Sequence, residues 1–483
     1  MLLKRFYDTK LAQASYLVGC SATGEALVID ANRDIDQYIE GAEVEGLRIA
    51  HVTETHIHAD FVSGSRELAA RTGGKLYLSA EGGAEWQYKF AGAAGATLLE
   101  DRDSFHVGRV RLEALHTPGH TPEHLSFVIT DTAATEQPIG VFTGDFIFVG
   151  DVGRPDLLER AVKVTGTMES AARTLFRSLQ AFRQLPDYLQ LWPAHGAGSA
   201  CGKSLGAVPQ TTLGYERIAN WAFAITDEEE FVRAVLAGQP EPPSYFAQMK
   251  RINRDGPRLL GGRLRPEREP ETRLRGLVSS NAVIVDTRPA ADYAAGHLKG
   301  TLNIPLNRSF TTWAGWLLPY DRDLYLIVDQ HCSSCVDDAV RDLVMIGLDR
   351  VVGYFGSEVL DGWVAEGGTL ATTSQMTADE LRRRMQKDEV RVIDVRAASE
   401  WEEASVPGAE NIHLGELAGR LDELSAGKPI VVHCQSGGRS AIAASLLEAH
   451  GVANVHNLVG GVVDWERRGH PVERNAPEHA SAS

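Results

Sequence analysis

Histidine and aspartate side chains occur at four places in the first half of the chain, each after an apolar segment. The first place is His56-Ile-His58-Ala-Asp60, which follows an apolar stretch that ends in His51-Val-Thr53. A strand that ends there would put these side chains at a junction with a loop, where they could converge on one ion. Neutral imidazole and carboxylate groups are ligand types that bind zinc or iron. The other three places contribute one such residue each: His120, Asp145 and His195.

A second candidate site is a cysteine loop near the C-terminus. An apolar segment, Val431-Val-His-Cys434, predicts a buried strand that ends at the cysteine, and a helix is predicted from Ser440. Between them, glycines let backbone N–H groups turn toward the sulfur, and the helix N-terminus and Arg439 add positive potential. Cys434 is therefore a candidate nucleophile that carries a persulfide. The residues of the loop are Gln435, Ser436, Gly437 and Gly438.

The spacing in this loop distinguishes two kinds of chemistry. Cysteine phosphatases place five residues between the cysteine and the arginine, whereas four residues separate Cys434 from Arg439. The shorter loop resembles the sulfur-binding cradle of rhodanese domains.

The second half of the chain contains an internal repeat. Asp286 precedes Asn303 by 17 positions, and Asp394 precedes Asn411 by the same number. In each copy apolar strands alternate with helix-like segments, which predicts parallel sheets covered on both faces. Both copies resemble rhodanese domains, α/β modules that move sulfane sulfur. Each copy also holds an Asp–Arg pair that we expect to be a buried ion pair: Asp286 with Arg288, and Asp394 with Arg396.

The middle copy departs from the last copy at its loop. In the last copy, 26 positions separate Cys434 from Gly460, a glycine shortly before a tryptophan. Counting back 26 positions from the corresponding glycine of the middle copy, Gly356, leads to Gln330. Gln330 would then replace the nucleophile and Cys335 the arginine, which indicates an inactive, structural copy. Alternatively, Cys332 and Cys335 are a redox pair, because Cys-x-x-Cys at a helix start favours a thiolate.

The histidine and aspartate set of the first half resembles that of the metallo-β-lactamase superfamily. Binuclear hydrolases of that superfamily, such as glyoxalase II, have a second histidine directly after the motif's aspartate, but here Phe61 follows Asp60. Two histidines and one carboxylate with open positions form the facial triad of non-haem Fe(II) oxygenases. The first half thus resembles the persulfide dioxygenases of the superfamily, and the whole chain resembles persulfide dioxygenase–rhodanese fusions.

This resemblance implies one Fe(II) per chain, with zinc as the alternative. The ligands that it implies are His56, His120 and Asp145. The neighbours that it implies for orienting ligands or substrate are His58, Asp60 and His195, although spacing alone does not separate His58 from the ligands. For Arg154 three roles stay open: it orients the loop after Asp145, it pairs with a substrate carboxylate, or it forms an ordinary salt bridge. Cys201, in a flexible loop just after His195, is a candidate for accepting or handing over sulfane sulfur.

The activity implied is the oxidation of low-molecular-weight thiol persulfides by O2, which yields thiol and sulfite in sulfide detoxification. Sulfite then attacks the Cys434 persulfide and leaves as thiosulfate. The alternative is a zinc thioester hydrolase of the glyoxalase II type, fused to a sulfurtransferase. A third possibility is a sulfur carrier or scaffold whose metal is structural.

The expected fold class is α/β, an αββα sandwich followed by two α/β rhodanese-like domains with parallel sheets. A stretch rich in Gly, Pro, Arg and Glu predicts a linker after the first domain. The expected boundaries are 1–252 for the dioxygenase domain, 253–273 for the linker, 274–372 for an inactive rhodanese-like domain, 373–473 for the catalytic one, and 474–483 for a disordered tail.

Bulk properties exclude several classes of protein. With 43% hydrophobic and 23% charged residues, the composition is that of a globular protein. The net charge of −17 argues against a nucleic-acid or membrane surface, since both need clustered Lys and Arg. The chain shows no apolar core of a signal peptide and no membrane helix, and its five sparse cysteines are typical of reduced thiols. We expect a cytoplasmic homo-oligomer.

Overall fold

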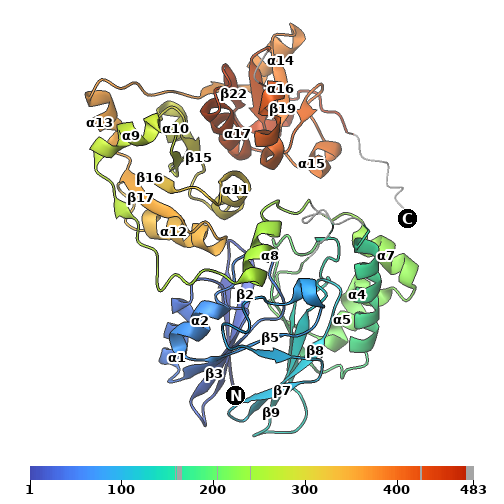
Figure 1. Ribbon diagram of the computed structural model, residues 1–483. Helices are drawn as coiled ribbons and strands as arrows, with labels where there is room; N and C mark the ends of the chain where they lie inside the picture. Colours follow the sequence, from blue (N-terminus) through green and yellow to red (C-terminus); the bar gives the residue numbers. More distant parts are fainter. Residues whose placement is uncertain (158, 160–165, 204, 240, 425–426, 475–483) are drawn as a thin grey trace. The chain divides into compact units, whose positions relative to one another are not determined.

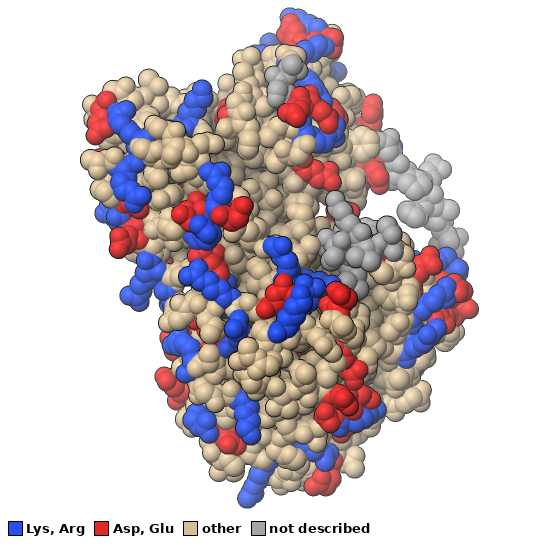
Figure 2. Space-filling model, in the orientation of Figure 1, with Lys and Arg blue, Asp and Glu red and all other residues tan. Residues whose placement is uncertain are grey.

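The computed structural model describes residues 1–474 except 158, 160–165, 204, 240 and 425–426 (Figure 1). Of the tail expected at 474–483, residues 475–483 lie outside the described residues. The chain forms two compact units, Met1–Arg263 with Val344–Gly347, and Leu264–Leu343 with Leu348–Ser483. No helix within the described parts is long and apolar enough to cross a membrane. On the face drawn in Figure 2, Lys and Arg side chains are interspersed with Asp and Glu.

The first unit is built on two six-stranded sheets. The first sheet runs in the order β1-β2-β3-β4-β5-β6, with β1 Leu2–Asp8, β2 Gln13–Cys20, β3 Glu25–Ile29, β4 Arg48–Thr53, β5 Lys75–Ser79 and β6 Thr97–Leu99. The second runs in the order β12-β11-β10-β9-β8-β7, with β7 Ser104–Val107, β8 Val110–His116, β9 Leu125–Asp131, β10 Gly140–Gly144, β11 Gln190–Pro193 and β12 Thr211–Thr212.

Helices cover the outer faces of these two sheets (Figure 1). The helices of the first unit are α1 Asp36–Val44, α2 Ser65–Thr72, α4 Met168–Phe182, α5 Leu213–Ala219, α6 Trp221–Ala224, α7 Glu228–Leu236 and α8 Phe246–Asp255, with the short 3-10 helix η1 Ala84–Trp86.

Three layers of apolar side chains hold the first unit together. Tyr38 and Leu68 lie in the layer between α1, α2 and the first sheet, and Phe127 lies in the layer between the two sheets. Leu175 and Phe231 belong to the third layer, between the second sheet and α4 and α7. Strands such as β8 alternate buried and half-exposed residues, as a sheet with one face in the core requires. The predicted αββα sandwich is confirmed.

The second unit contains two five-stranded parallel sheets with the same topology. The first has the order β13-β17-β16-β14-β15, with β13 Glu267–Arg268, β14 Val283–Asp286, β15 Leu302–Asn303, β16 Leu324–Val328 and β17 Val351–Gly356. The second has the order β18-β22-β21-β19-β20, with β18 Ser374–Met376, β19 Arg391–Asp394, β20 Glu410–Asn411, β21 Ile430–His433 and β22 Val455–Leu458.

Helices connect these parallel strands, as such connections require. In the middle copy they are η2 Glu271–Arg273, α9 Leu274–Ser279, α10 Ala290–Ala295, α11 Phe310–Leu317, α12 Cys335–Met345 and α13 Val359–Ala365. In the last copy they are α14 Ala378–Gln386, α15 Ala398–Glu403, η3 Leu414–Arg420, α16 Leu421–Leu424, α17 Gly438–Ala449 and α18 Gly461–Arg467.

The residues that repeat in the sequence make the same hydrogen bonds in both copies. Nδ2 of Asn303 donates to the carbonyl oxygens of Asp286 and Arg288, at 2.9 and 3.0 Å. Asn411 makes the corresponding two bonds in the last copy, both at 3.0 Å. Both predicted ion pairs form, with N–O distances of 2.7 Å: Asp286 with Arg288, and Asp394 with Arg396. The second pair is buried as expected, whereas Arg288 of the first is half-buried.

The range expected as a linker, 253–273, contains ordered elements. Helix α8 continues to Asp255, β13 pairs with β17, and η2 follows. Asn253 is buried in the first unit, where Oδ1 accepts from the N–H of Ser63. Its Nδ2 donates to the carbonyl oxygens of His58 and Phe61 at 2.8 and 2.7 Å. The start of this range therefore supports the metal motif, which its polar composition does not indicate.

Candidate metal centre and sulfur loop

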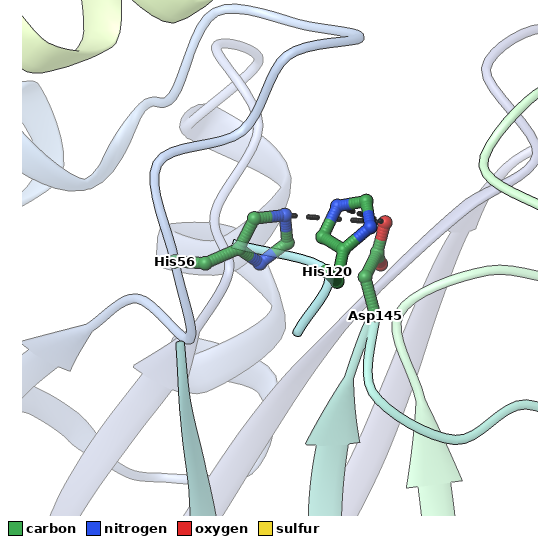
Figure 3. A group of neighbouring side chains, drawn as sticks. All are labelled: His56, His120 and Asp145. Carbon is green, nitrogen blue, oxygen red and sulfur yellow. Dashed lines mark ion pairs between the residues drawn. The ribbon is translucent and has the colours of Figure 1, made fainter. Parts of the chain in front are cut away.

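Three residues from three different strand ends come together in the first unit (Figure 3). His56 follows β4, His120 follows β8, and Asp145 comes directly after β10. The Nε2 atoms of His56 and His120 lie 3.9 and 3.5 Å from Oδ2 of Asp145. One donor atom of each residue lies within 4.8 Å of the others, and all three side chains are buried. These are the three residues that the resemblance to the persulfide dioxygenases implies as metal ligands.

His56 and His120 each make a hydrogen bond through Nδ1, which leaves Nε2 available to a metal. Nδ1 of His120 donates to the carbonyl oxygen of Arg154 at 3.1 Å. Nδ1 of His56 lies 3.0 Å from Oγ1 of Thr55, whose hydroxyl hydrogen goes to Asp30. Since that hydroxyl accepts from the ring, the hydrogen of His56 is also on Nδ1. Both Nε2 lone pairs therefore face Asp145, which is the tautomer that a metal ligand needs.

The charge state of this group also fits a cation. Burial lowers the pKa of His120, and it lowers the pKa of His56 well below its ordinary value, so both rings are neutral. Apart from contact with the Cys201 thiol, no described residue donates a hydrogen bond to the carboxylate oxygens of Asp145. A buried carboxylate without donors is costly, and a bound metal would compensate it. Two imidazoles and one carboxylate can hold a divalent metal here.

His58 lies beside this group but faces another partner. Its Nε2 is 3.2 Å from Oδ1 of Asp30, and its ring packs 4.4 Å from that of Phe61. Burial opposes the charged form, but the Asp30 carboxylate prevails and raises the pKa of His58 to about 9. Phe61 thus packs on His58 at the place where a binuclear hydrolase has a further histidine.

A second group of metal-type residues adjoins the first: Asp60, His195 and Cys201, with one atom of each within 4.8 Å of the others. Nε2 of His195 lies 3.2 Å from Oδ2 of Asp60 and 3.5 Å from Oδ1 of Asp145. Nδ1 of His195 donates to the carbonyl oxygen of Ala12 at 3.0 Å, so this Nε2 is free as well. The resemblance implies Asp60 and His195 beside the metal, but it does not imply Cys201 as a metal ligand.

Cys201 is buried, whereas the sequence indicated a thiol in a flexible loop. Burial and the carboxylates of Asp60 and Asp145 raise the pKa of this thiol well above its ordinary value. Without a cation beside it, Cys201 is therefore a protonated thiol. Within this loop, the Ser199 hydroxyl accepts the N–H of Cys201 at 3.1 Å, which closes a local turn at the cysteine.

Arg154 is fully buried and makes an ion pair within its own loop. Its Nε and Nη2 donate to Asp156 at 2.9 and 2.7 Å, and Nη1 donates to the carbonyl oxygen of Ala200 at 3.1 Å. These contacts support the salt-bridge interpretation. They connect the backbone that holds His120 to the segment that carries Cys201.

Four buried residues that support the metal motif escaped sequence reasoning: Asp30, Glu123, His124 and Asn253. Asp30 has a φ of 55° and accepts the Thr55 N–H at 2.7 Å. Glu123 accepts the N–H of Ile57 at 2.8 Å, and Nε2 of His124 accepts the N–H of Asp145 at 3.1 Å. The available signal was the spacing of His116, His120 and His124. Nε2 of His116 instead bonds the carbonyl oxygen of Pro122 at 2.7 Å.

Cys434 lies at the end of β21 in the second unit and is buried. The N–H of Gly437 donates to its sulfur at 3.2 Å, and the Ser440 hydroxyl lies 3.6 Å from it. Gly437 has a φ of 102°, which favours glycine, and α17 begins directly after it. The loop thus directs donors at the sulfur, and the helix begins two residues earlier than the sequence indicated.

The other residues of the loop have distinct contacts. Arg439 makes a two-pronged ion pair with Glu400, at 2.6 and 2.7 Å, so its hydrogen bonds do not go to the sulfur. Oε1 of Gln435 accepts from Arg396 at 3.0 Å. Ser436 and Gly438 line a pocket of about 790 Å³ together with Cys434 and Arg439.

The middle copy has no cysteine at the end of its strand. The strand pairing aligns the two copies. Asp286 pairs with Ile327 on β16, and Asp394 pairs with His433 on β21. The counterpart of Cys434 is therefore Val328, so the prediction that Gln330 takes this place is wrong by two positions. Counting back from a glycine failed because the loops between strand and helix differ in length.

The loop of the middle copy is the longer one. Residues 328–334 separate Ile327 from α12, whereas only residues 434–437 separate His433 from α17. Helix α12 begins at Cys335, which is bonded to Cys332 in a disulfide. Cys335 therefore does not stand at the position of Arg439.

Comparison with known proteins agrees with this architecture. Residues 8–195 match the metallo-beta-lactamase superfamily, and residues 271–360 and 377–468 match the rhodanese-like domain. A solved metallo-beta-lactamase from Staphylococcus aureus is 46% identical with a TM-score of 0.67, covering 74% of this chain and 99% of that one. A mitochondrial persulfide dioxygenase of Bos taurus is 30% identical over 201 residues, 40% of this chain and 68% of the dioxygenase. A hydroxyacylglutathione hydrolase of Polaromonas sp. is 33% identical over 182 residues, 38% of this chain and 61% of the hydrolase.

Proposed function

Because the chain belongs to the metallo-β-lactamase superfamily and carries two rhodanese-like domains, we propose that it is a non-haem Fe(II) persulfide dioxygenase coupled to a sulfurtransferase. One observation carries this proposal. His56 and His120 turn free Nε2 atoms toward Asp145, a two-histidine, one-carboxylate set, while the same chain holds the persulfide-type loop of Cys434.

Fe(II) bound by this set would supply the chemistry that joins O2 to the terminal sulfur of a small thiol persulfide. The protein's own residues orient the ligands. The carbonyl of Arg154 and the hydroxyl of Thr55 hold the two imidazoles by Nδ1. Glu123 and Asn253 bond the backbone of the loop that carries His56 and His58, so the ligands are held in place before any substrate arrives. Hydrolysis by one water would complete the reaction and give the thiol and sulfite.

Cys434 would take sulfane sulfur from a second persulfide. Sulfite would then attack the outer sulfur of the Cys434 persulfide, the S–S bond would break, and thiosulfate would leave. The leaving group is the Cys434 thiolate, and the N–H of Gly437 and the N-terminus of α17 support that negative charge.

A zinc thioester hydrolase of the glyoxalase II type, fused to a sulfurtransferase, is the second candidate. The group Asp60, His195 and Cys201 favours it, since these residues offer donors for a second metal beside Asp145. A cysteine and a histidine are ligand types that suit zinc.

Oxygen uptake by the iron-loaded full chain, with glutathione persulfide as substrate and metal content measured on the same sample, tests the proposal. We expect uptake that scales with iron and is lost in His120→Ala. The matched variant His116→Ala removes an imidazole from the same motif outside the metal group and should keep uptake. Hydrolysis of acyl-glutathione without oxygen, with two zinc ions per chain that fall to one in Cys201→Ser, would instead establish the hydrolase.

A further inference from the structure

The disulfide of the middle copy and the nucleophile of the last copy open onto one pocket. The pocket of about 790 Å³ lies within the second unit, and Cys332, Cys335 and Cys434 all line it. Cys332 and Cys335 are half-buried, so their sulfurs are not sealed in a core as that of Cys20 is. Volumes of this size hold small ligands in other proteins.

The loop that carries Cys332 and Cys335 is not the Cys434 loop with its cysteine simply replaced. It lacks a cysteine at the strand end, where Val328 stands, and it is longer than its counterpart. The additional length carries Cys332 and Cys335 to the pocket instead. Cys335 begins α12, where the backbone N–H groups of a first helical turn stabilise a thiolate.

We propose that Cys332 and Cys335 are a second sulfur-handling site, which in its dithiol form takes sulfane sulfur from Cys434 and releases it as hydrogen sulfide. The inference rests on the proposed function, because it requires that Cys434 carries a persulfide. Under this proposal the middle copy takes part in the chemistry, although it has no cysteine at the position of Cys434.

A single turnover that starts from the dithiol balances without any further reagent, and a small-molecule thiol supplies the two electrons that reopen the disulfide for the next one. One thiolate of the pair attacks the outer sulfur of the Cys434 persulfide, whose S–S bond breaks, so that Cys434 leaves as a thiolate. The second thiolate then attacks the cysteine sulfur of the new persulfide and expels hydrosulfide. The sulfane sulfur gains two electrons, and the two thiols lose them by forming the disulfide that joins Cys332 and Cys335 in this structure.

The walls of the pocket suit this exchange. Arg288 and Arg439 line it, and each is paired with a carboxylate, Asp286 and Glu400 respectively. They contribute fixed positive groups near the anionic sulfur species without presenting an unpaired charge. Trp313, from α11, adds an apolar wall that limits water around a reactive persulfide.

The test is a single turnover of the full chain under anaerobic conditions, with the pair reduced and the reductant removed. One equivalent of thiosulfate loads Cys434, and the sulfite released measures that loading independently of the pair. Sulfide release is then measured, and mass spectrometry follows the Cys434 peptide and the Cys332–Cys335 peptide. We expect one sulfite and one sulfide per chain, an unmodified Cys434, and a closed disulfide.

Three controls separate the pair's chemistry from damage to the fold. Cys332→Ser/Cys335→Ser should release sulfite but no sulfide, and should keep the persulfide on Cys434. Wild-type protein with the disulfide left closed should behave the same way without any substitution. Ser333→Ala/Ser334→Ala, which changes the exposed residues between the cysteines, should match the reduced wild type.

Loading of Cys434 without sulfide release from the reduced wild type would overturn the inference and leave the proposed sulfurtransferase intact. Absence of sulfite release would overturn the proposed role of Cys434, and the inference with it. A Cys434 persulfide that decays equally fast with the pair reduced, oxidised or replaced by serine would show that the disulfide is only structural.

Discussion

The Nδ1 atom of His120 donates a hydrogen bond to the carbonyl oxygen of Arg154 at 3.1 Å. The guanidinium of the same arginine is bound by Asp156, so a buried ion pair holds the backbone that orients a metal ligand. Arg154, a candidate for contacting substrate, therefore has a different role here. Asp156 holds its side chain, and its main-chain carbonyl orients the imidazole of His120.

Asp156→Asn should weaken metal binding, because it loosens the loop whose carbonyl holds His120. Partners that orient metal ligands affect affinity by roughly tenfold or more. The dissociation constant for Zn²⁺ or Fe²⁺, measured on the full chain by competition with a chelator, checks this. Glu229→Gln, which breaks the exposed ion pair with Arg173, is the matched control and should leave affinity unchanged. Equal affinities in both variants would contradict a role for Asp156.

Asn253→Ala should destabilise the first unit, because it leaves three buried backbone groups without partners. We expect the free energy of unfolding to fall by about 3 kcal/mol. Urea denaturation, followed by a signal from the first unit, measures this loss. Arg254→Ala alters the next residue of α8, which is more exposed, and should cost far less. A similar small loss in both variants would mean that water replaces the amide.

Cys434→Ser should leave oxygen uptake intact while the product changes from thiosulfate to sulfite. The metal group belongs to the first unit and Cys434 to the second, so removing the sulfur does not alter the ligands. Ion chromatography of both products under persulfide turnover provides the readout. Thiosulfate formed at the normal rate by this variant would refute the coupling of the two activities.

Gly437→Ala should slow sulfur transfer by the last copy strongly. The residue has a φ of 102°, and an added Cβ costs roughly 1–2 kcal/mol there and turns its N–H away from the Cys434 sulfur. Thiosulfate-dependent loading of Cys434 measures the effect. Gly451→Ala, at a φ of 83° with open space around it, imposes similar backbone strain away from the loop. Equal loading rates in the two variants would show that the Gly437 N–H is dispensable.

Much of the architecture follows from local pattern. Alternating or continuous apolar runs predict strands, and the polar residues at their ends, His56, His120 and Asp145, are the ones that meet. The two copies of the repeat could be aligned because Asp286 and Asp394 each precede an asparagine by a fixed spacing. These features depend on residues close in sequence or on recurring strand ends, so periodicity is sufficient to find them.

Other features required the tertiary structure. Cys201 lies beside Asp60 and His195 because a loop folds inward, and nothing in its composition records that direction. Asn253 lies in the range predicted as a linker, yet its side chain accepts a hydrogen bond from the N–H of Ser63, 190 residues earlier in the chain. The counterpart of Cys434 is Val328 because strand pairing, not residue count, sets the register between the copies. Residue types and strand-forming runs are local properties, so they can be predicted without the fold. Only packing between distant segments decided which side chains face one another, since those contacts depend on loop paths that local pattern does not encode.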